Sequence, residues 1–173
     1  MKNLIYIFCL ATLLSINSCL PDKCCEPPQP STVVTAQKNG APWSDSYASG
    51  KLSDRDTLSI TAVSGNVSPA DAFIKADTIN IKIPYTAPVS YQLKANEVFY
   101  GLFNNSIVTR YQLDSTYDNV INITSYQRIS SPNTTMPDVV KITGTFSLRF
   151  IDPNNAAGIT FQNGNFSSMV PYL

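Results

Sequence analysis

The sequence predicts an all-β domain, built as an antiparallel β-sandwich or a partly open β-barrel of about eight to ten strands. Apolar and polar residues alternate with a period of two, turn residues recur at short intervals, and no long helical period is present. The clearest strand is Val140 to Phe150, in which apolar residues and Gly144 alternate with lysine, threonine, serine and arginine. Such alternation is typical of a strand with one buried and one wet face.

The same alternation predicts the other strands, with turn residues between them. Strands are expected at Thr32 to Lys38, Thr57 to Val63, Thr78 to Pro84, Val89 to Ala95, Val98 to Phe103, Ile107 to Leu113, Val120 to Tyr126 and Ile159 to Gln162. Turns are expected at Asn39-Gly40, Ser64 to Asn66, Pro84 to Pro88, Asn104-Asn105, Ser130 to Asn133, Asp152 to Asn155 and Asn163-Gly164. A helix of at most about two turns is predicted at Ser68 to Ala76, where Pro69 can open the first turn.

The first residues predict an exported protein. Lys2 precedes an almost continuous apolar run from Leu4 to Leu14, which is the order of charge and hydrophobic segment found in secretory signals. Ser15 and Asn17 interrupt this run well before the roughly 20 apolar residues that a membrane-spanning helix needs. We therefore interpret residues 1–18 as a signal peptide.

The end of this segment, Ile16-Asn17-Ser18-Cys19, resembles the bacterial lipobox, although Asn17 departs from the usual second position. The resemblance implies cleavage before Cys19 and lipidation of that cysteine, with acyl chains such as palmitate anchoring the protein. The alternative is an ordinary signal peptide followed by an incidental cysteine. We expect a lipid-anchored protein of the cell envelope, in the outer membrane, with the periplasmic or surface face left open.

Residues 19–31 are rich in proline, which predicts an extended, semi-rigid tether. Cys24 and Cys25 lie inside it and allow three interpretations: an inert or mutually bonded pair, an intermolecular disulfide, or a redox role. The chain has no histidine and no cysteine after Cys25, so no zinc-binding spacing exists. We expect neither a metal nor a cofactor.

The composition limits the size of the domain and the kinds of partner that it can bind. Removing 18 residues from 173 leaves 155, enough for a single β domain at 32–173 with a real core. Without Lys2 the chain carries 11 basic and 12 acidic residues, which is not the basic excess expected of a nucleic-acid binder.

Composition also limits the chemistry. The absence of histidine excludes a Ser/His/Asp triad. Glu26 and Glu97 are the only glutamates. Most of the aspartates adjoin turn residues, where a carboxylate commonly bonds the local backbone.

The two ends of the domain carry recognisable segments. Val34 to Trp43 combines a strand, the Asn39-Gly40 turn and the one tryptophan, while Ile142 to Ser147 contains Gly-Thr-Phe-Ser and precedes Ile159 to Phe166. These segments resemble the ends of uncharacterised lipoprotein domains of Bacteroidetes, with residues 64–135 much less matched. That family has no known function, so the resemblance implies a β architecture and an envelope location but no catalytic residue.

Trp43 has two interpretations. As the lone tryptophan of a small β domain it is expected to close one end of the core, and Gly144 then makes room for a neighbour such as that ring. Alternatively, an exposed Trp43 stacks on a sugar, helped by strand tyrosines, which are Tyr47, Tyr85, Tyr91, Tyr100, Tyr111 and Tyr126.

Three segments resemble the Asp-Ser/Thr sequences that Bacteroidetes use for O-glycosylation: Asp56-Thr57-Leu58, Asp77-Thr78-Ile79 and Asp114-Ser115-Thr116. The resemblance implies glycans on Thr57, Thr78 and Ser115. The alternative is that Asp-Thr simply opens strands in this sequence.

The leading hypothesis for function is a non-enzymatic binding or accessory module, holding a glycan, a small ligand or an outer-membrane partner. One alternative is a glycan hydrolase with paired aspartates, perhaps joined by Glu97, which needs carboxylates about 5 to 10 Å apart. Another is a structural or assembly lipoprotein linked through Cys24 and Cys25.

Overall fold

The computed structural model describes residues 31–53, 57–66, 75–84, 88–104, 107–131, 137–152 and 155–172. Within these ranges every regular element is a strand, and all the pairings are antiparallel, which confirms the predicted all-β class. The strands are β1 (Ser31–Lys38), β2 (Ala41–Ser44), β3 (Tyr47–Ser53), β4 (Thr57–Asn66), β5 (Lys75–Pro84), β6 (Val89–Gln92), β7 (Val98–Asn104), β8 (Ile107–Leu113), β9 (Val120–Ile129), β10 (Val139–Asp152) and β11 (Asn155–Pro171). No membrane-crossing helix occurs in this part of the chain.

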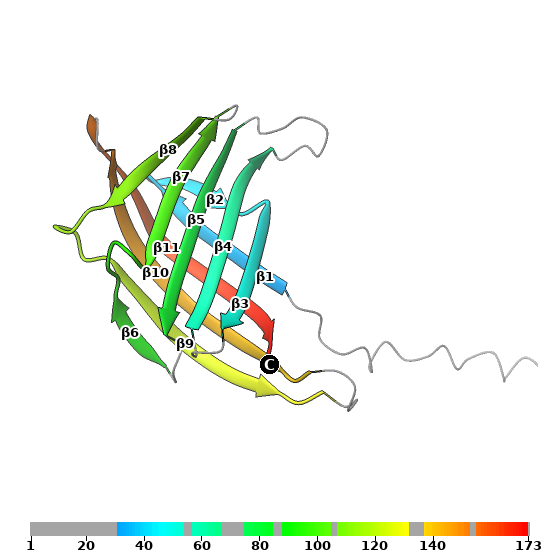
Figure 1. Ribbon diagram of the computed structural model, residues 1–173. Helices are drawn as coiled ribbons and strands as arrows, with labels where there is room; N and C mark the ends of the chain where they lie inside the picture. Colours follow the sequence, from blue (N-terminus) through cyan, green and yellow to red (C-terminus); the bar gives the residue numbers. More distant parts are fainter. Residues whose placement is uncertain are drawn as a thin grey trace, which may run out of the picture.

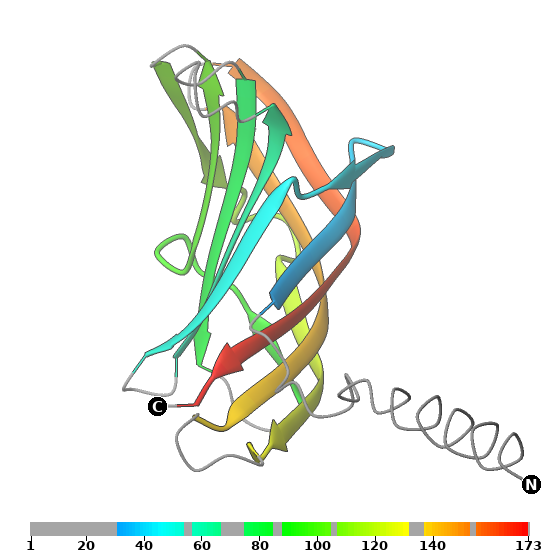
Figure 2. The same cartoon turned by 90° about the vertical axis from the view of Figure 1, so that its right-hand side faces the viewer.

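The strands form one sheet that curls over itself without closing into a barrel (Figure 1). One half contains β2, β1, β11, β10, β9 and β6, and the other contains β8, β7, β5, β4 and β3. The halves are joined where the end of β10 pairs with the end of β8, at Phe150 opposite Leu113. Figure 2 shows the two halves facing each other, so the apolar sides of both can share one core.

On the far side from this joint, β3 packs across the other half of the sheet without ladder pairing. A Cβ on Gly50 of β3 would lie 2.0 Å from Ser168 Oγ, so only glycine allows this close approach. Thr32 and Ser168 share a hydroxyl hydrogen bond of 2.9 Å beneath it. The contact between β3 and the opposite half of the sheet is therefore held by side-chain packing.

The core follows the alternation that the sequence predicts. On β10 the apolar residues at alternate positions are buried, which are Val140, Ile142, Phe146, Leu148 and Phe150. The opposite half contributes alternate residues of β4 and β5, which are Leu58, Ile60, Ala62, Ile79, Ile81 and Ile83. Burial of this apolar surface is the main favourable term in folding.

Glycine and phenylalanine face each other twice between β10 and β11. Gly144 lies opposite Phe166, and Phe146 lies opposite Gly164. A Cβ on Gly144 would sit 2.4 Å from the Phe166 ring, and one on Gly164 would sit 2.5 Å from the Phe146 ring. Gly144 does make room for an aromatic ring, as expected, but that ring belongs to Phe166 and not to Trp43.

Several predicted boundaries are wrong. Asn163-Gly164 is no turn, because β11 continues through it as a bulge in which Asn163 has a φ of 50°. Ser64 to Asn66 continues β4 and pairs with β5. The β6 strand ends at Gln92, short of the predicted Ala95.

The remaining differences between prediction and structure concern two strands and one helix. Strands β2 and β3 were not predicted, because β2 is very short and β3 has too few apolar residues to show alternation. Of the predicted helix at 68–76, Lys75 and Ala76 belong to β5, and residues 68–74 lie outside the described ranges.

Candidate functional site

The candidate site residues predicted from the sequence do not come together in one site among the residues that the structure describes. Cys19, Cys24 and Cys25 fall outside the described ranges. Thr57 and Thr78 are half-buried in β4 and β5. Only Ser115 is an exposed hydroxyl among the three predicted glycosylation positions.

Trp43 belongs to the core. Its side chain is 7% exposed, and its ring meets Phe161 edge-to-face at a centroid distance of 5.5 Å. The stacking alternative is therefore wrong in this structure, because a sugar needs an open ring face. The ring joins a cluster in which Tyr100 and Phe150 also contact Phe161.

A hollow of about 430 Å³ lies on the outer side of β9, β10 and β11. Its polar lining comes from five uncharged side chains, which are Asn122, Thr145, Ser147, Gln162 and Asn163. Val120 and Phe146 add apolar surface. This volume is within the range of small-ligand sites, about 300 to 1,000 Å³.

The strand pattern explains the hollow. Asn122 and Thr145 are cross-strand partners that point away from the core, since their neighbours Ile121 and Phe146 are buried. On β11 the bulge brings both Gln162 and Asn163 to this side, where Asn163 Nδ2 donates to Gln37 Oε1 at 3.1 Å. A bulge bends a sheet and redirects side chains, so the hollow forms where the ladder is irregular.

One end of the hollow is held by the turn between β8 and β9. Tyr117 Oη and Ser147 Oγ share a hydrogen bond of 2.9 Å. Asn119, which is 2% exposed, donates from Nδ2 to the carbonyls of Asp114 and Tyr117 and accepts from the Arg149 amide at 2.8 Å. Because every polar group of Asn119 is used, the turn is fixed to β10.

Asp114 stabilises the same turn. Its carboxylate accepts from the Thr116 hydroxyl at 2.6 Å and the Thr116 amide at 2.9 Å, and Arg149 Nε lies 3.3 Å away. These Thr116 hydrogen bonds, with a smaller contribution from Arg149, lower the pKa of Asp114. The Asp-Ser-Thr sequence here thus has a structural duty, whether or not Ser115 carries a glycan.

A second hollow, of about 330 Å³, lies over β5 and the start of β7. Its lining includes Lys82 and Glu97, beside Asn80, Asn96 and Phe99. Glu97 accepts a hydrogen bond from the Lys94 amide at 2.8 Å, which closes the turn before β7. This lining holds a single carboxylate, whereas glycoside hydrolysis commonly uses a pair.

A charged pair closes the space between the halves near the end of β1 and the start of β5. Lys38 Nζ donates to Asp77 Oδ2, and the ammonium lies 5.6 Å from the centroid of the Tyr100 ring. Burial raises the pKa of Tyr100, whose hydroxyl has no hydrogen-bond partner among the described residues. The pair caps the aromatic cluster and stays largely shielded, with side-chain exposures of 24% and 19%.

Within the described ranges no group of three histidine, cysteine, aspartate or glutamate side chains could hold a metal ion. The outer hollow was not predicted from the sequence. Its residues were visible as polar positions in strands, but only the bulge and the pairing of three strands bring them together.

Comparison with known proteins gives one match. A domain of unknown function, DUF6252, covers residues 30–171. The chain belongs to this family. The match spans both halves of the sheet, in agreement with the prediction of an uncharacterised domain. No curated protein and no solved structure matches the chain.

Proposed function

We propose that this DUF6252 chain is a non-enzymatic binding module that holds a neutral, polar ligand, a glycan, in the hollow over β9, β10 and β11. The observation that carries the proposal is the lining of that hollow: three amides and two hydroxyls with no ionisable side chain. Amides and hydroxyls both donate and accept hydrogen bonds, as sugar hydroxyls do. Val120, which is half-buried, offers apolar contact for the carbon face of a sugar ring.

The proposal includes the location. Cleavage before Cys19 and lipidation of that residue would place the domain on a membrane of the cell envelope, the outer membrane, in the manner of Bacteroidetes lipoproteins. The proline-rich residues 19–30 would then separate the lipid from the first strand. Palmitate labelling of the expressed protein tests this: label that persists in a Cys19→Ala variant contradicts the anchor.

The binding test uses the mature chain with Cys19→Ala, so that it stays in solution. We expect it to retain a subset of glycans on an array, and the best of these to bind in a calorimetric titration. The double variant Asn122→Ala/Thr145→Val should weaken binding at least roughly tenfold, because loss of hydrogen bonds worth about 0.5 to 1.5 kcal/mol each accumulates.

The matched control is the double variant Ser125→Ala/Gln127→Ala. Both residues are exposed on β9, and their partners on β10, Thr143 and Lys141, do not line the hollow. Glycan affinity that falls equally in both double variants would show that the hollow is not the site. A wild-type chain that retains no glycan would refute the ligand class.

A further inference from the structure

The second hollow, over β5 and the start of β7, holds charged groups of both signs. Lys82 supplies an ammonium group and Glu97 a carboxylate, while Asn80 and Asn96 add amides and Phe99 adds an aromatic ring. The volume of about 330 Å³ is at the lower end of the range of small-ligand sites, about 300 to 1,000 Å³. The hollow therefore has room for a small ligand and offers it two opposite charges.

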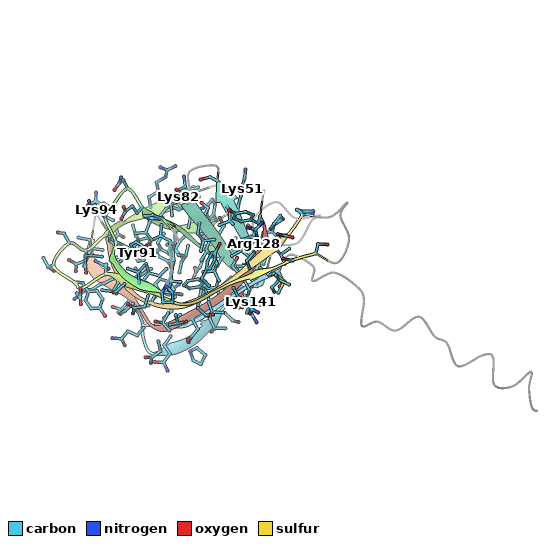
Figure 3. The ribbon with its side chains drawn as sticks, turned by 90° about the horizontal axis from the view of Figure 1, so that it is seen from below. Lys51, Lys82, Tyr91, Lys94, Arg128 and Lys141 are labelled. Carbon is cyan, nitrogen blue, oxygen red and sulfur yellow. The ribbon has the colours of Figure 1, made fainter. Side chains whose placement is uncertain are left out.

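This hollow is separate from the one proposed for the glycan. Lys82 lies between the buried Ile81 and Ile83 on β5, so its side chain points away from the core. Lys141 belongs to β10, which lines the hollow on the other half of the sheet. Viewed from below, Lys82 and Lys141 lie on opposite sides of the molecule (Figure 3). The two hollows can therefore be occupied independently.

The connection between β6 and β7 forms one wall of the second hollow and is held at both ends. Leu93 is 5% exposed, and its amide donates to the Asn119 carbonyl at 2.8 Å. The Glu97 amide donates to the Lys94 carbonyl at 2.9 Å, and the Glu97 carboxylate accepts from the Lys94 amide at 2.8 Å. The position of this carboxylate is therefore fixed before any ligand binds, which lowers the entropy cost of binding.

The two charged residues are neighbours that do not neutralise each other. The Lys82 amide donates to the Glu97 carbonyl at 2.7 Å, so their side chains leave adjacent backbones. Neither side chain forms an ion pair with any residue that the structure describes. Each can therefore form a charge-assisted hydrogen bond with an external group of opposite sign.

The aromatic wall is fixed as well. A Cβ on Gly101 would lie 2.8 Å from the Phe99 ring, so this ring covers the glycine on the outer face of β7. The Arg110 guanidinium lies 5.4 Å from the ring centroid, within the range of a cation–π contact. Phe99 therefore presents a stationary apolar surface beside the two charges.

We infer that the second hollow binds a small zwitterion, an α-amino acid with an apolar side chain. The ligand carboxylate binds Lys82, the ligand ammonium binds Glu97, and the side chain of the ligand lies against Phe99. Asn80 Nδ2 donates to Thr61 Oγ1 at 2.7 Å, which leaves the amide oxygen of Asn80 to accept from the ligand ammonium.

The presence of both charges favours a zwitterion over an ion of a single sign. A simple carboxylate is attracted by Lys82 but repelled by Glu97, and a simple amine meets the reverse. Only a ligand with both groups gains from both residues at once. The inference does not depend on the glycan or on the lipid anchor.

The first test is a calorimetric titration of the mature chain with Cys19→Ala. L-valine, L-leucine and L-phenylalanine are the probes, and we expect at least one of them to bind. The tightest is then compared with the same molecule lacking its amino group or its carboxylate; for L-leucine these are 4-methylpentanoate and 3-methylbutylamine. Each analogue should bind at least roughly tenfold more weakly, because it loses a hydrogen bond to a charged group. Binding of none of the three amino acids, or equal binding of an analogue, overturns the inference.

Two variants assign the charges. Lys82→Met removes the ammonium group, so it should weaken amino-acid binding at least roughly tenfold without weakening the amine analogue. Glu97→Gln keeps an acceptor for the Lys94 amide, so it should weaken the amino acid without weakening the carboxylate analogue. Losses that are the same for both analogues in both variants would show that these residues do not contact the ligand as inferred.

The matched control is Lys51→Met. Lys51 is exposed on the same outer face, with Ser59 of β4 between it and Lys82 in the register, and it does not line the hollow. Amino-acid affinity that falls as much in Lys51→Met as in Lys82→Met would mean that only net charge matters, which contradicts a defined site. Circular dichroism should show all three variants folded. Their glycan affinity should equal that of wild type, so failure of the glycan proposal and failure of this one remain distinguishable.

Discussion

The two faces of β9, β10 and β11 differ sharply although they belong to the same three strands. The inner face is filled by aliphatic and aromatic side chains, with Phe146 and Phe166 each packed over a glycine. The outer face carries small amides and hydroxyls around a hollow. Because side chains alternate between faces, one strand can supply core stability and a binding surface at adjacent positions.

Substitutions at neighbouring positions in these strands should therefore affect either stability or binding, because neighbouring side chains lie on opposite faces. A substitution on the inner face meets close-packed neighbours, whereas one on the outer face meets solvent or a ligand. Pairs of adjacent residues therefore provide controls for each other, and the following variants use such pairs.

The largest effect is expected at Phe161, which is completely buried and contacts Trp43, Tyr100 and Phe150. Phe161→Ala should lower the free energy of unfolding by about 4 kcal/mol, because it leaves a cavity in the aromatic cluster. The adjacent Gln162→Ala, on the outer face, should change it by less than about 0.5 kcal/mol. Urea denaturation measures the free energy of unfolding of both variants. Equal decreases would contradict the proposed difference between the two faces.

Gly144 should be the next most sensitive position. A Cβ there would lie 2.4 Å from both the Asn122 carbonyl oxygen and the Phe166 ring. Gly144→Ala should cost about 2 to 3 kcal/mol through overpacking. The neighbouring Thr145→Val keeps its shape and points outward, so thermal unfolding should leave it close to wild type. A stable Gly144→Ala protein would mean that Phe166 can move aside.

Asn119 links the two faces, because it fastens the β8–β9 turn to β10 beside the hollow. Asn119→Ala should cost about 2 kcal/mol, since it leaves the Arg149 amide without its acceptor and removes the side-chain hydrogen bonds to the Asp114 and Tyr117 carbonyls. Glycan affinity should also fall, because Ser147 loses its fixed contact with Tyr117. The exposed Asp118→Ala is the control in the calorimetric titration. Unchanged glycan affinity in Asn119→Ala would show that the fixed β8–β9 turn does not contribute to binding in the hollow.

The smallest effect is expected from the acid titration of Asp114. Its pKa is lowered from 3.8 in the folded state, so it stabilises the fold above about pH 4 and loses that contribution as the pH falls further. Urea midpoints of wild type and Asp114→Asn should differ most at pH 7 and converge as the pH falls from about 3.8 through the lowered folded-state pKa of Asp114. A difference that is constant with pH would assign the role of Asp114 to shape alone.

Much of the fold was predictable because alternation is a local signal. The prediction of Val139–Asp152 was close because its buried residues recur at every second position. In Ile107–Leu113 the half-buried Thr109, Tyr111 and Leu113 alternate with exposed residues. Asn163-Gly164 was misjudged as a turn because those residues favour positive φ values. In the fold, the positive φ of Asn163 forms a bulge in β11. Gly164 is required because a Cβ there would collide with the Phe146 ring.

The sequence by itself determined the all-β class, the inward-facing residues of most strands, and the absence of histidine chemistry, because composition and period act locally. Only the tertiary structure decided which neighbour fills each glycine, why Trp43 is buried, and how Asn122, Thr145 and Asn163 come to line one hollow. Those outcomes depend on strand order and register, which join residues distant in sequence and leave little trace in any single segment.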